Sequence, residues 1–281
     1  MRDDSRKSSV CGGARRLGIS VLAAGALSLG PGSAQAEIPA PKQTCRIFDA
    51  TLGEKGQPTA EITTDQMEVA LAQISDGVLV IDARPYEEFA MSHIPGAVNV
   101  APKPGLPMSQ YTSDVGEIEK LTQGRKGRTI VLYCNGPFCG KSKRVATDLL
   151  AAGYTHVLRY QLGIPVWRAL GHPAQAEADA IGSALDKDKT AVVIDAREPA
   201  AFQAGTVPGA RNVRFEEVAK AKDDGRLPML DHNTRIFVVG KDAPEARAAA
   251  QEIAKNAFQN VSYYAGSVEE LMKGRAGSGS R

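Results

Sequence analysis

The chain has 281 residues, 43% of them hydrophobic and 23% charged, which is enough for two globular domains with separate cores. Lys and Arg number 34, Asp and Glu number 32, and the net charge is only +2. Because there is no long basic block and aromatic residues make up only 5% of the chain, these features argue against a protein that binds nucleic acid.

Residues 1–36 have the layout of a cleavable secretory signal peptide. A basic stretch ending at Arg16 precedes the apolar run 17–29, and a small-x-small site ends at Ala36. An apolar run this short is not a comfortable membrane span. We therefore expect cleavage after Ala36, export to the periplasm or secretion, and a mature chain without a membrane span.

Cleavage would also change the cysteine count. Cys11 would leave with the signal peptide, and the mature chain would keep Cys45, Cys134 and Cys139. An odd number of cysteines in an oxidising compartment leaves at least one thiol without an intramolecular partner. This fits no disulfide framework, but it is compatible with one reactive thiol. Cys45 lies in a lead-in, residues 37–61, to which we assign no role.

Two segments of the chain repeat each other. "VLVIDARPYEEFAMSHIPGAVNV" at residues 78–100 and "AVVIDAREPAAFQAGTVPGARNV" at residues 191–213 share Ile-Asp-Ala-Arg, Pro-Gly-Ala and an asparagine at a constant offset, without a gap. Chance is a poor explanation for such agreement. The sequence therefore predicts two copies of one domain.

Each copy alternates short apolar runs with helical patterns. The runs are too short and too uniformly apolar for surface helices, and they predict buried parallel strands with helices on both faces of the sheet. The fold class is therefore α/β, with two domains at 62–173 and 181–273, a linker at 174–180 and a flexible tail at 274–281. The predicted strands are 78–81, 129–133, 157–160, 192–194, 235–239 and 261–264, and the clearest predicted helices are 64–74, 141–152 and 244–256.

The stretch "YCNGPFCGKS" carries the chemistry of the first copy. Cys134 follows a strand directly, and ligands of parallel sheets bind beyond the carboxyl ends of strands, where Asp82 also lies. A loop of small residues can turn its N–H groups inward, and the next helix directs its positive end to the same point, so both favour a nucleophilic thiolate. The candidate cradle comprises Asn135, Gly136, Pro137, Phe138, Cys139, Gly140, Lys141 and Ser142.

The first copy resembles the rhodanese domain, the fold of thiosulfate:cyanide sulfurtransferases. The resemblance rests on "VIDARPYEEFAMSHIPGAVNV", "IVLYC" and "GYTHVLRYQLGIPVWRALGHP". It implies two rhodanese-like domains, a persulfide carried by Cys134, and structural support from Asp82, Arg84 and Glu88. The loop departs from the usual pattern, because it lacks the arginine and has two extra residues before Lys141.

The second copy resembles the same domain but lacks the thiol. Alignment of "TIVLYC" with "RIFVVG" places Gly240 at the position of Cys134, so no persulfide can form there. We therefore expect the second domain to be degenerate, and to cover or shape the site of the first.

Several alternatives stay open for single residues. Cys139 can bond to Cys134, act as a resolving thiol, or fill space, and geometry decides between these. Asp82 and Arg84 fit a structural ion pair, because the pair recurs in the copy without the cysteine. His93 fits a packed turn better than a catalytic role. Two cysteines without a nearby histidine pair are too few ligands for zinc.

The main hypothesis is an exported sulfurtransferase. The Cys134 thiolate would take sulfur from a small sulfur-containing anion such as thiosulfate and pass it to a thiol or to cyanide, without a metal or an organic cofactor. The alternative is a redox role without turnover, in which Cys134 and Cys139 cycle between dithiol and disulfide, or a docking module for another exported protein.

Overall fold

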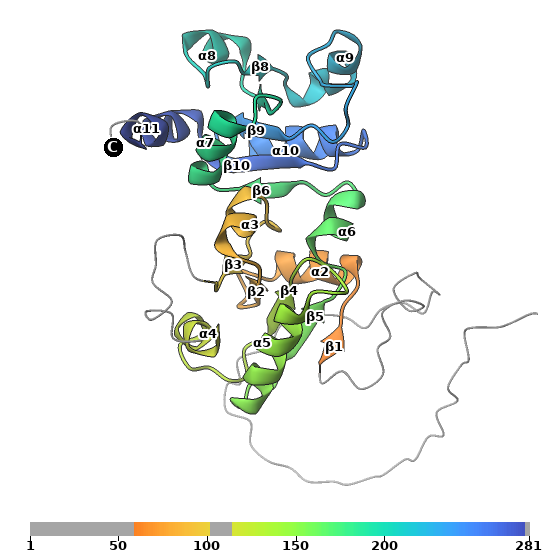
Figure 1. The fold of residues 1–281 in the computed structure, drawn as a ribbon, viewed down its shortest axis with the longest axis vertical. Coiled ribbons are helices and arrows are strands. Elements are labelled where there is room, and N and C mark those ends of the chain that lie inside the picture. The colour runs from red at the N-terminus through yellow and green to blue at the C-terminus, as the bar shows by residue number, and fades with distance from the viewer. Residues whose placement is uncertain (1–58, 102–113, 279–281) are drawn as a thin grey trace, which may run out of the picture.

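The computed structural model describes residues 59–101 and 114–278, which form two α/β units stacked along the long axis of the molecule (Figure 1). The expected signal peptide and Cys45 lie outside the described residues. Every strand pairing within the two sheets is parallel, and helices pack on both faces of each sheet. The predicted fold class is therefore confirmed.

The first sheet has five strands in the order β1-β5-β4-β2-β3. Its central strands are buried on both faces, which is why they appear in the sequence as continuous apolar runs. The bounds are β1 Ala60–Glu61, β2 Leu79–Asp82, β3 Val98–Asn99, β4 Ile130–Tyr133 and β5 Val157–Tyr160.

Side chains that alternate along these strands divide the core of the first domain in two. Val80 and Val131 pack with α2 (Thr64–Ala72) and α6 (Gly163–Ala169), whereas Ile81 and Leu132 pack with α4 (Asp114–Thr122) and α5 (Gly140–Ala151). The remaining helix, α3 (Tyr86–Met91), follows β2. The two layers hold the loop between β4 and α5 at the carboxyl edge of the sheet.

The second sheet repeats this order as β6-β10-β9-β7-β8. Helices α9 and α10 cover one of its faces, and α7 and α11 cover the other. The strands are β6 Ala174–Ala176, β7 Val192–Asp195, β8 Arg211–Asn212, β9 Ile236–Gly240 and β10 Val261–Ser267. The helices are α7 Ala178–Lys187, α8 Pro199–Ala204, the 3-10 helix η2 Phe215–Glu217, α9 Val218–Asp223, α10 Ala243–Ala254 and α11 Val268–Ser278.

The structure corrects the expected boundaries of the domains. Residues 174–180 are not a linker, because Ala174–Ala176 form an edge strand paired with β10, and α7 begins at Ala178. The lead-in likewise ends before residue 60, where β1 starts to pair with β5. The expected tail from residue 274 is helical through Ser278. Each missed segment is short or polar, and distant residues determine its structure.

Backbone hydrogen bonds join the two domains. His93 and Gln175 form an antiparallel bridge in which each N–H donates to the other residue's carbonyl oxygen at 2.8 Å. The N–H of Glu177 donates to the carbonyl oxygen of Ala90 at 2.7 Å, and Met91 packs against the core of the second domain. The chain of α3 and the turn after it therefore lies directly against β6 and α7 (Figure 1).

Candidate active site

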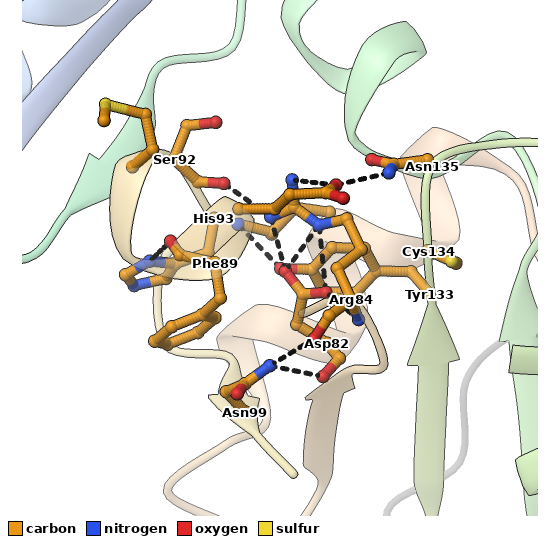
Figure 2. A network of polar contacts seen from close by, with 12 residues as sticks. Asp82, Arg84, Phe89, Ser92, His93, Asn99, Tyr133, Cys134 and Asn135 are labelled. Carbon is orange, nitrogen blue, oxygen red and sulfur yellow. Dashed lines mark hydrogen bonds and ion pairs between the residues drawn. The ribbon is translucent and has the colours of Figure 1, made fainter. Parts of the chain in front are cut away.

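A buried ion pair lies at the carboxyl end of β2. Arg84 donates to the Asp82 carboxylate from its backbone N–H at 2.9 Å and from Nε and Nη2 at 3.0 and 2.6 Å. Arg84 also donates to the carbonyl oxygen of Ser92, and the Asn99 amide donates to the carbonyl oxygens of Asp82 and Arg84 (Figure 2). Burial alone would lower the pKa of Arg84, but the hydrogen bond and charge of Asp82 raise it.

The second domain contains the same network without a cysteine. Arg197 donates to Asp195 from its backbone N–H at 3.0 Å and from Nε and Nη2 at 3.1 and 2.8 Å. Arg197 also bonds the carbonyl oxygen of Gly205, and Asn212 bonds the carbonyl oxygens of Asp195 and Arg197. The network thus belongs to the scaffold of both copies, and this placement fits a supporting role for Asp82 and Arg84.

Tyr133 links this scaffold to the cysteine loop. Its side chain is fully buried, its hydroxyl oxygen accepts a hydrogen bond from the N–H of Ile94 at 3.0 Å, and its ring lies 6.0 Å from the guanidinium carbon of Arg84. Burial and the nearby Asp82 carboxylate raise the pKa of Tyr133 well above its ordinary value. The phenol therefore stays protonated at neutral pH. Its hydrogen bond with Ile94 holds Tyr133, the residue directly before Cys134, in place.

Cys134 and Cys139 form a disulfide in the structure. Cys134 directly follows β4 and is only 3% exposed, whereas Cys139 is half-buried. Gly136 has a positive φ of 98°, which turns the chain back, and the N–H of Cys139 donates to the carbonyl oxygen of Gly136 at 3.0 Å. This turn brings the two Cα atoms to 6.1 Å, within the range of a disulfide.

The loop rests on the segment between β5 and α6. The carbonyl oxygen of Cys134 accepts from the N–H of Ile164 at 3.2 Å, and the carbonyl oxygen of Pro137 accepts from the Gln161 side chain at 2.7 Å. Gly163 has a φ of 66°, and a Cβ there would lie 2.3 Å from the carbonyl oxygen of Cys134. Only glycine fits this close approach. Sequence reasoning missed Gln161 and Gly163, whose one local signal is a glycine three residues after a strand.

The other predicted cradle residues lie in different environments. Asn135 is exposed and donates to Glu88, which lies 3.9 Å from Arg84 Nη1, so the loop is connected to the buried ion pair. Phe138 is fully exposed, and Ser142 is buried on α5. Gly140 and Lys141 open α5, which has no acidic residue in its first turn and no side-chain cap.

Further along α5, Arg144 does not reach the loop. Its guanidinium pairs with Asp114 of α4 and with Asp148 on its own helix. Arg144 therefore does not replace the arginine that the usual rhodanese loop carries, and it joins α5 to α4 instead.

In the second domain, carboxylates occupy the corresponding position. Asp242 caps α10 by accepting from the N–H of Glu245 at 3.0 Å, and the Glu245 carboxylate accepts from the N–H of Lys241 at 2.8 Å. A Cβ on Gly240 would lie 3.0 Å from the backbone nitrogen of Ala246. The end of β9 therefore has neither a thiol nor free N–H groups for an external anion at these positions.

Comparison with known proteins identifies the domain type. The model of the rhodanese-like domain matches residues 66–170 and 177–273. The HTH-type transcriptional regulator Rv0324 of Mycobacterium tuberculosis (strain ATCC 25618 / H37Rv) is 31% identical over 126 residues, which are 44% of this chain and 48% of that protein. Protein HIGH ARSENIC CONTENT 1, mitochondrial, of Arabidopsis thaliana is 28% identical over 120 residues, which are 40% of this chain and 66% of that protein. The chain thus spans between about half and two thirds of these relatives.

Two similar solved structures carry sulfurtransferase names. The thiosulfate sulfurtransferase from Pseudomonas aeruginosa is 20% identical, with 77% of this chain and 42% of that chain covered and a TM-score of 0.34. SseA from Escherichia coli, described among 3-mercaptopyruvate sulfotransferases, is 20% identical, with 74% and 98% covered and a TM-score of 0.33. In the part of the chain that the structure describes, no helix is long and apolar enough to cross a membrane. The two matches to the family model together cover most of the chain. The chain therefore belongs to the rhodanese-like domain family and carries two copies of the domain.

Proposed function

We propose that the protein is a sulfurtransferase of the rhodanese type with one active site, at Cys134. The observation that carries the proposal is the position of Cys134 in a rhodanese-like domain, at the carboxyl end of β4 and before α5. Helix α5 has no acidic residue in its first turn, whereas Asp242 and Glu245 fill that place on α10. An anionic donor and a thiolate are therefore favoured in the first domain alone.

The reaction would run in two steps after reduction of the disulfide. The Cys134 thiolate attacks the outer sulfur of a donor such as thiosulfate, the S–S bond of the donor breaks, and sulfite leaves with the bonding electron pair. The resulting Cys134 persulfide then gives its outer sulfur to a thiol or to cyanide, and the Cys134 thiolate returns. No step requires a metal or an organic cofactor.

The test compares two Cys→Ser variants of the reduced full chain. With thiosulfate and cyanide, we expect wild type to release sulfite and to form thiocyanate. Cys134→Ser should lose both signals. Cys45→Ser, the same substitution outside the described residues, should keep them. If wild type forms neither product with several sulfane donors, the proposal is wrong.

The bonded state of the two cysteines favours a second candidate function. Cys134 and Cys139 form a disulfide between residues five apart, so a dithiol/disulfide couple without sulfur transfer is chemically available. This function predicts that the protein exchanges electrons with a thiol redox buffer but releases no sulfite from thiosulfate. The assay for sulfite on reduced protein distinguishes the two functions.

Export is part of the proposal and rests on the basic, apolar and small-residue layout of residues 1–36. We expect the exported protein to begin at Glu37 when it is recovered from its native host. Sequencing of its N-terminus checks this, and recovery of the intact N-terminus in the cytoplasmic fraction alone would contradict it.

A further inference from the structure

We infer that Cys139 is the resolving thiol of this site, which attacks the Cys134 persulfide and releases its outer sulfur as hydrosulfide. The inference rests on the proposed persulfide chemistry of Cys134 and adds a second product to it. The domain would then be a reductive desulfurating enzyme: sulfane sulfur and a dithiol are converted to hydrosulfide and a disulfide.

Burial favours an internal acceptor over an external one. Cys134 is 3% exposed, so a bulky external thiol has to enter the loop before it can reach that sulfur atom. Cys139 lies on the same loop, is half-buried, and forms a covalent bond to Cys134 in the structure. An acceptor held in place reacts at a high effective concentration, because its translational and rotational entropy is already lost.

Contacts of the loop backbone hold Cys139 close to Cys134 independently of the bond between the two sulfur atoms. The turn at Gly136 is closed by the N–H of Cys139, the Gln161 side chain holds the carbonyl oxygen of Pro137, and Gly163 packs against the backbone of Cys134. None of these contacts involves either sulfur. We therefore expect the Cα separation of 6.1 Å to persist in the dithiol form and to keep Cys139 within reach of Cys134.

The environment of Cys139 also favours its thiolate. Cys139 is the N-cap residue of α5, a helix of 12 residues whose first turn contains no acidic side chain. The positive end of a helix stabilises a thiolate and lowers the pKa of a cysteine placed there. The helix N-terminus therefore stabilises negative charge on the sulfur of the resolving residue.

The step balances without an added oxidant. The Cys139 thiol gives up its proton and attacks Sγ of Cys134, the same atom to which it is bonded in the structure. A new S–S bond forms between the two residues, the bond from Cys134 Sγ to the outer sulfur breaks, and that sulfur leaves with the electron pair and the proton as hydrosulfide. Attack on the outer sulfur would merely move the persulfide to Cys139.

A dithiol reductant, or two monothiols, would complete the cycle. Cys139 is the more exposed residue of the pair, so we expect an external thiolate to attack its sulfur and Cys134 to leave as the thiolate. Attack of a second thiol releases Cys139. The residue freed first is thus the one that begins the next turnover.

The experiment uses the full chain with Cys11→Ser and Cys45→Ser, so that Cys134 and Cys139 are its only thiols. The protein is reduced, freed of reductant and mixed anaerobically with thiosulfate alone. We expect stoichiometric sulfite and hydrosulfide, with loss of both thiols. Adding Cys139→Ser should keep the sulfite, abolish the hydrosulfide, and leave a stable adduct of about 32 Da. Serine is a preferred N-cap residue, so this variant preserves the start of α5.

The outcomes separate the inference from the proposed function. If the protein with both cysteines keeps a stable persulfide and releases no hydrosulfide, the resolving role is overturned and sulfur transfer by Cys134 stands. If Cys139→Ser forms neither sulfite nor a persulfide with any of several sulfane donors, the proposed function fails and the resolving role fails with it.

Discussion

At the scale of single residues, the buried charges are explained by their partners. Asp82 is fully buried and Arg84 is 3% exposed, and the two form several hydrogen bonds with each other. A buried carboxylate without such a partner is costly, because its charge is no longer solvated by water. Since the pair recurs as Asp195 and Arg197, a supporting role was accessible from the internal repeat alone.

Removal of Arg84 should therefore be severe. We expect Arg84→Ala to lower the free energy of unfolding of the first domain by about 3–5 kcal/mol, because Asp82 stays buried without its cation. Urea unfolding of the full chain measures this loss. Lys120→Ala breaks an exposed ion pair with Glu117 and should cost at most about 1 kcal/mol. Equal small effects of the two substitutions would contradict this account of the buried pair.

At the scale of elements, the same strand–loop–helix unit occurs in both domains, but the groups in its loop differ. In the first domain, the loop between β4 and α5 carries two cysteines, and the segment before α6 holds it from behind. In the second domain, the shorter connection between β9 and α10 is closed by Asp242 and Glu245. The scaffold is therefore shared, and the two domains differ in the groups that lie at the helix N-terminus.

Gly163 provides a test of how the loop is positioned. Gly163→Ala adds a Cβ that would lie 2.3 Å from the carbonyl oxygen of Cys134 and 2.4 Å from the nitrogen of Gly136, and neither backbone atom can rotate away. A loop displaced by about 1 Å should lower kcat/KM for sulfur transfer on the order of 100-fold. Steady-state kinetics of the reduced variant measures this.

Gly153→Ala is the matched control for that substitution. Gly153 also has a positive φ, of 86°, but a Cβ there meets no atom within 4 Å. Gly153→Ala should lower the free energy of unfolding by about 1–2 kcal/mol because of the strained backbone, and it should leave kcat/KM unchanged. Equal kinetic defects in the two variants would mean that backbone strain, and not the contact with the cysteine loop, is responsible.

At the scale of the whole molecule, the two domains are joined through the turn after α3. His93 bonds Gln175 through its backbone, and its ring stacks on Phe89 with the centroids 3.9 Å apart. Its Nδ1 lies 2.9 Å from the carbonyl oxygen of Phe89, which can only accept, so this nitrogen carries the proton in the neutral ring. The packed position agrees with the expectation from the sequence, although the contact with the second domain was not foreseen.

The stability of this junction should depend on pH. Burial lowers the pKa of His93 from 6.5 to about 4, despite the opposing effect of the Phe89 carbonyl and the Asp82 carboxylate; Arg84 and Glu177 are the other charged groups near the ring. Because the unfolded chain binds the proton first, the contribution of His93 is full above about pH 6.5 and is lost as pH falls to about 4, by roughly 3 kcal/mol.

Chemical unfolding between pH 7 and pH 4 measures this dependence against two variants. His93→Gln removes the titrating group, so its stability should fall less steeply with decreasing pH than that of wild type, whatever its stability at neutral pH. His156→Gln replaces an exposed histidine and should reproduce the wild-type slope. Parallel slopes for all three proteins would show that His93 does not titrate as its burial indicates.

Much of the architecture can be predicted from local patterns of apolar residues in the sequence. Runs such as 129–133 and 192–194 are apolar on both faces of the strand, and the structure has β4 and β7 within a residue of these positions. The repeat around Asp82 and Asp195 indicates two copies of one domain without any knowledge of contacts. The sequence pattern does not predict the strand Ala174–Ala176, because Ala-Gln-Ala has no apolar run and forms a strand only by pairing with β10.

Three features follow from the sequence alone: the two-domain α/β organisation, the absence of the thiol in the second copy, and the place of Cys134 at the end of a strand. Apolar runs and repeated motifs indicate these features, because each can be recognised within a few consecutive residues. The bond between Cys134 and Cys139, and the support that Gln161 and Gly163 give to the loop, are apparent only in the folded chain. These contacts depend on how a turn folds back and on which element packs behind it, and neither has a period in the sequence.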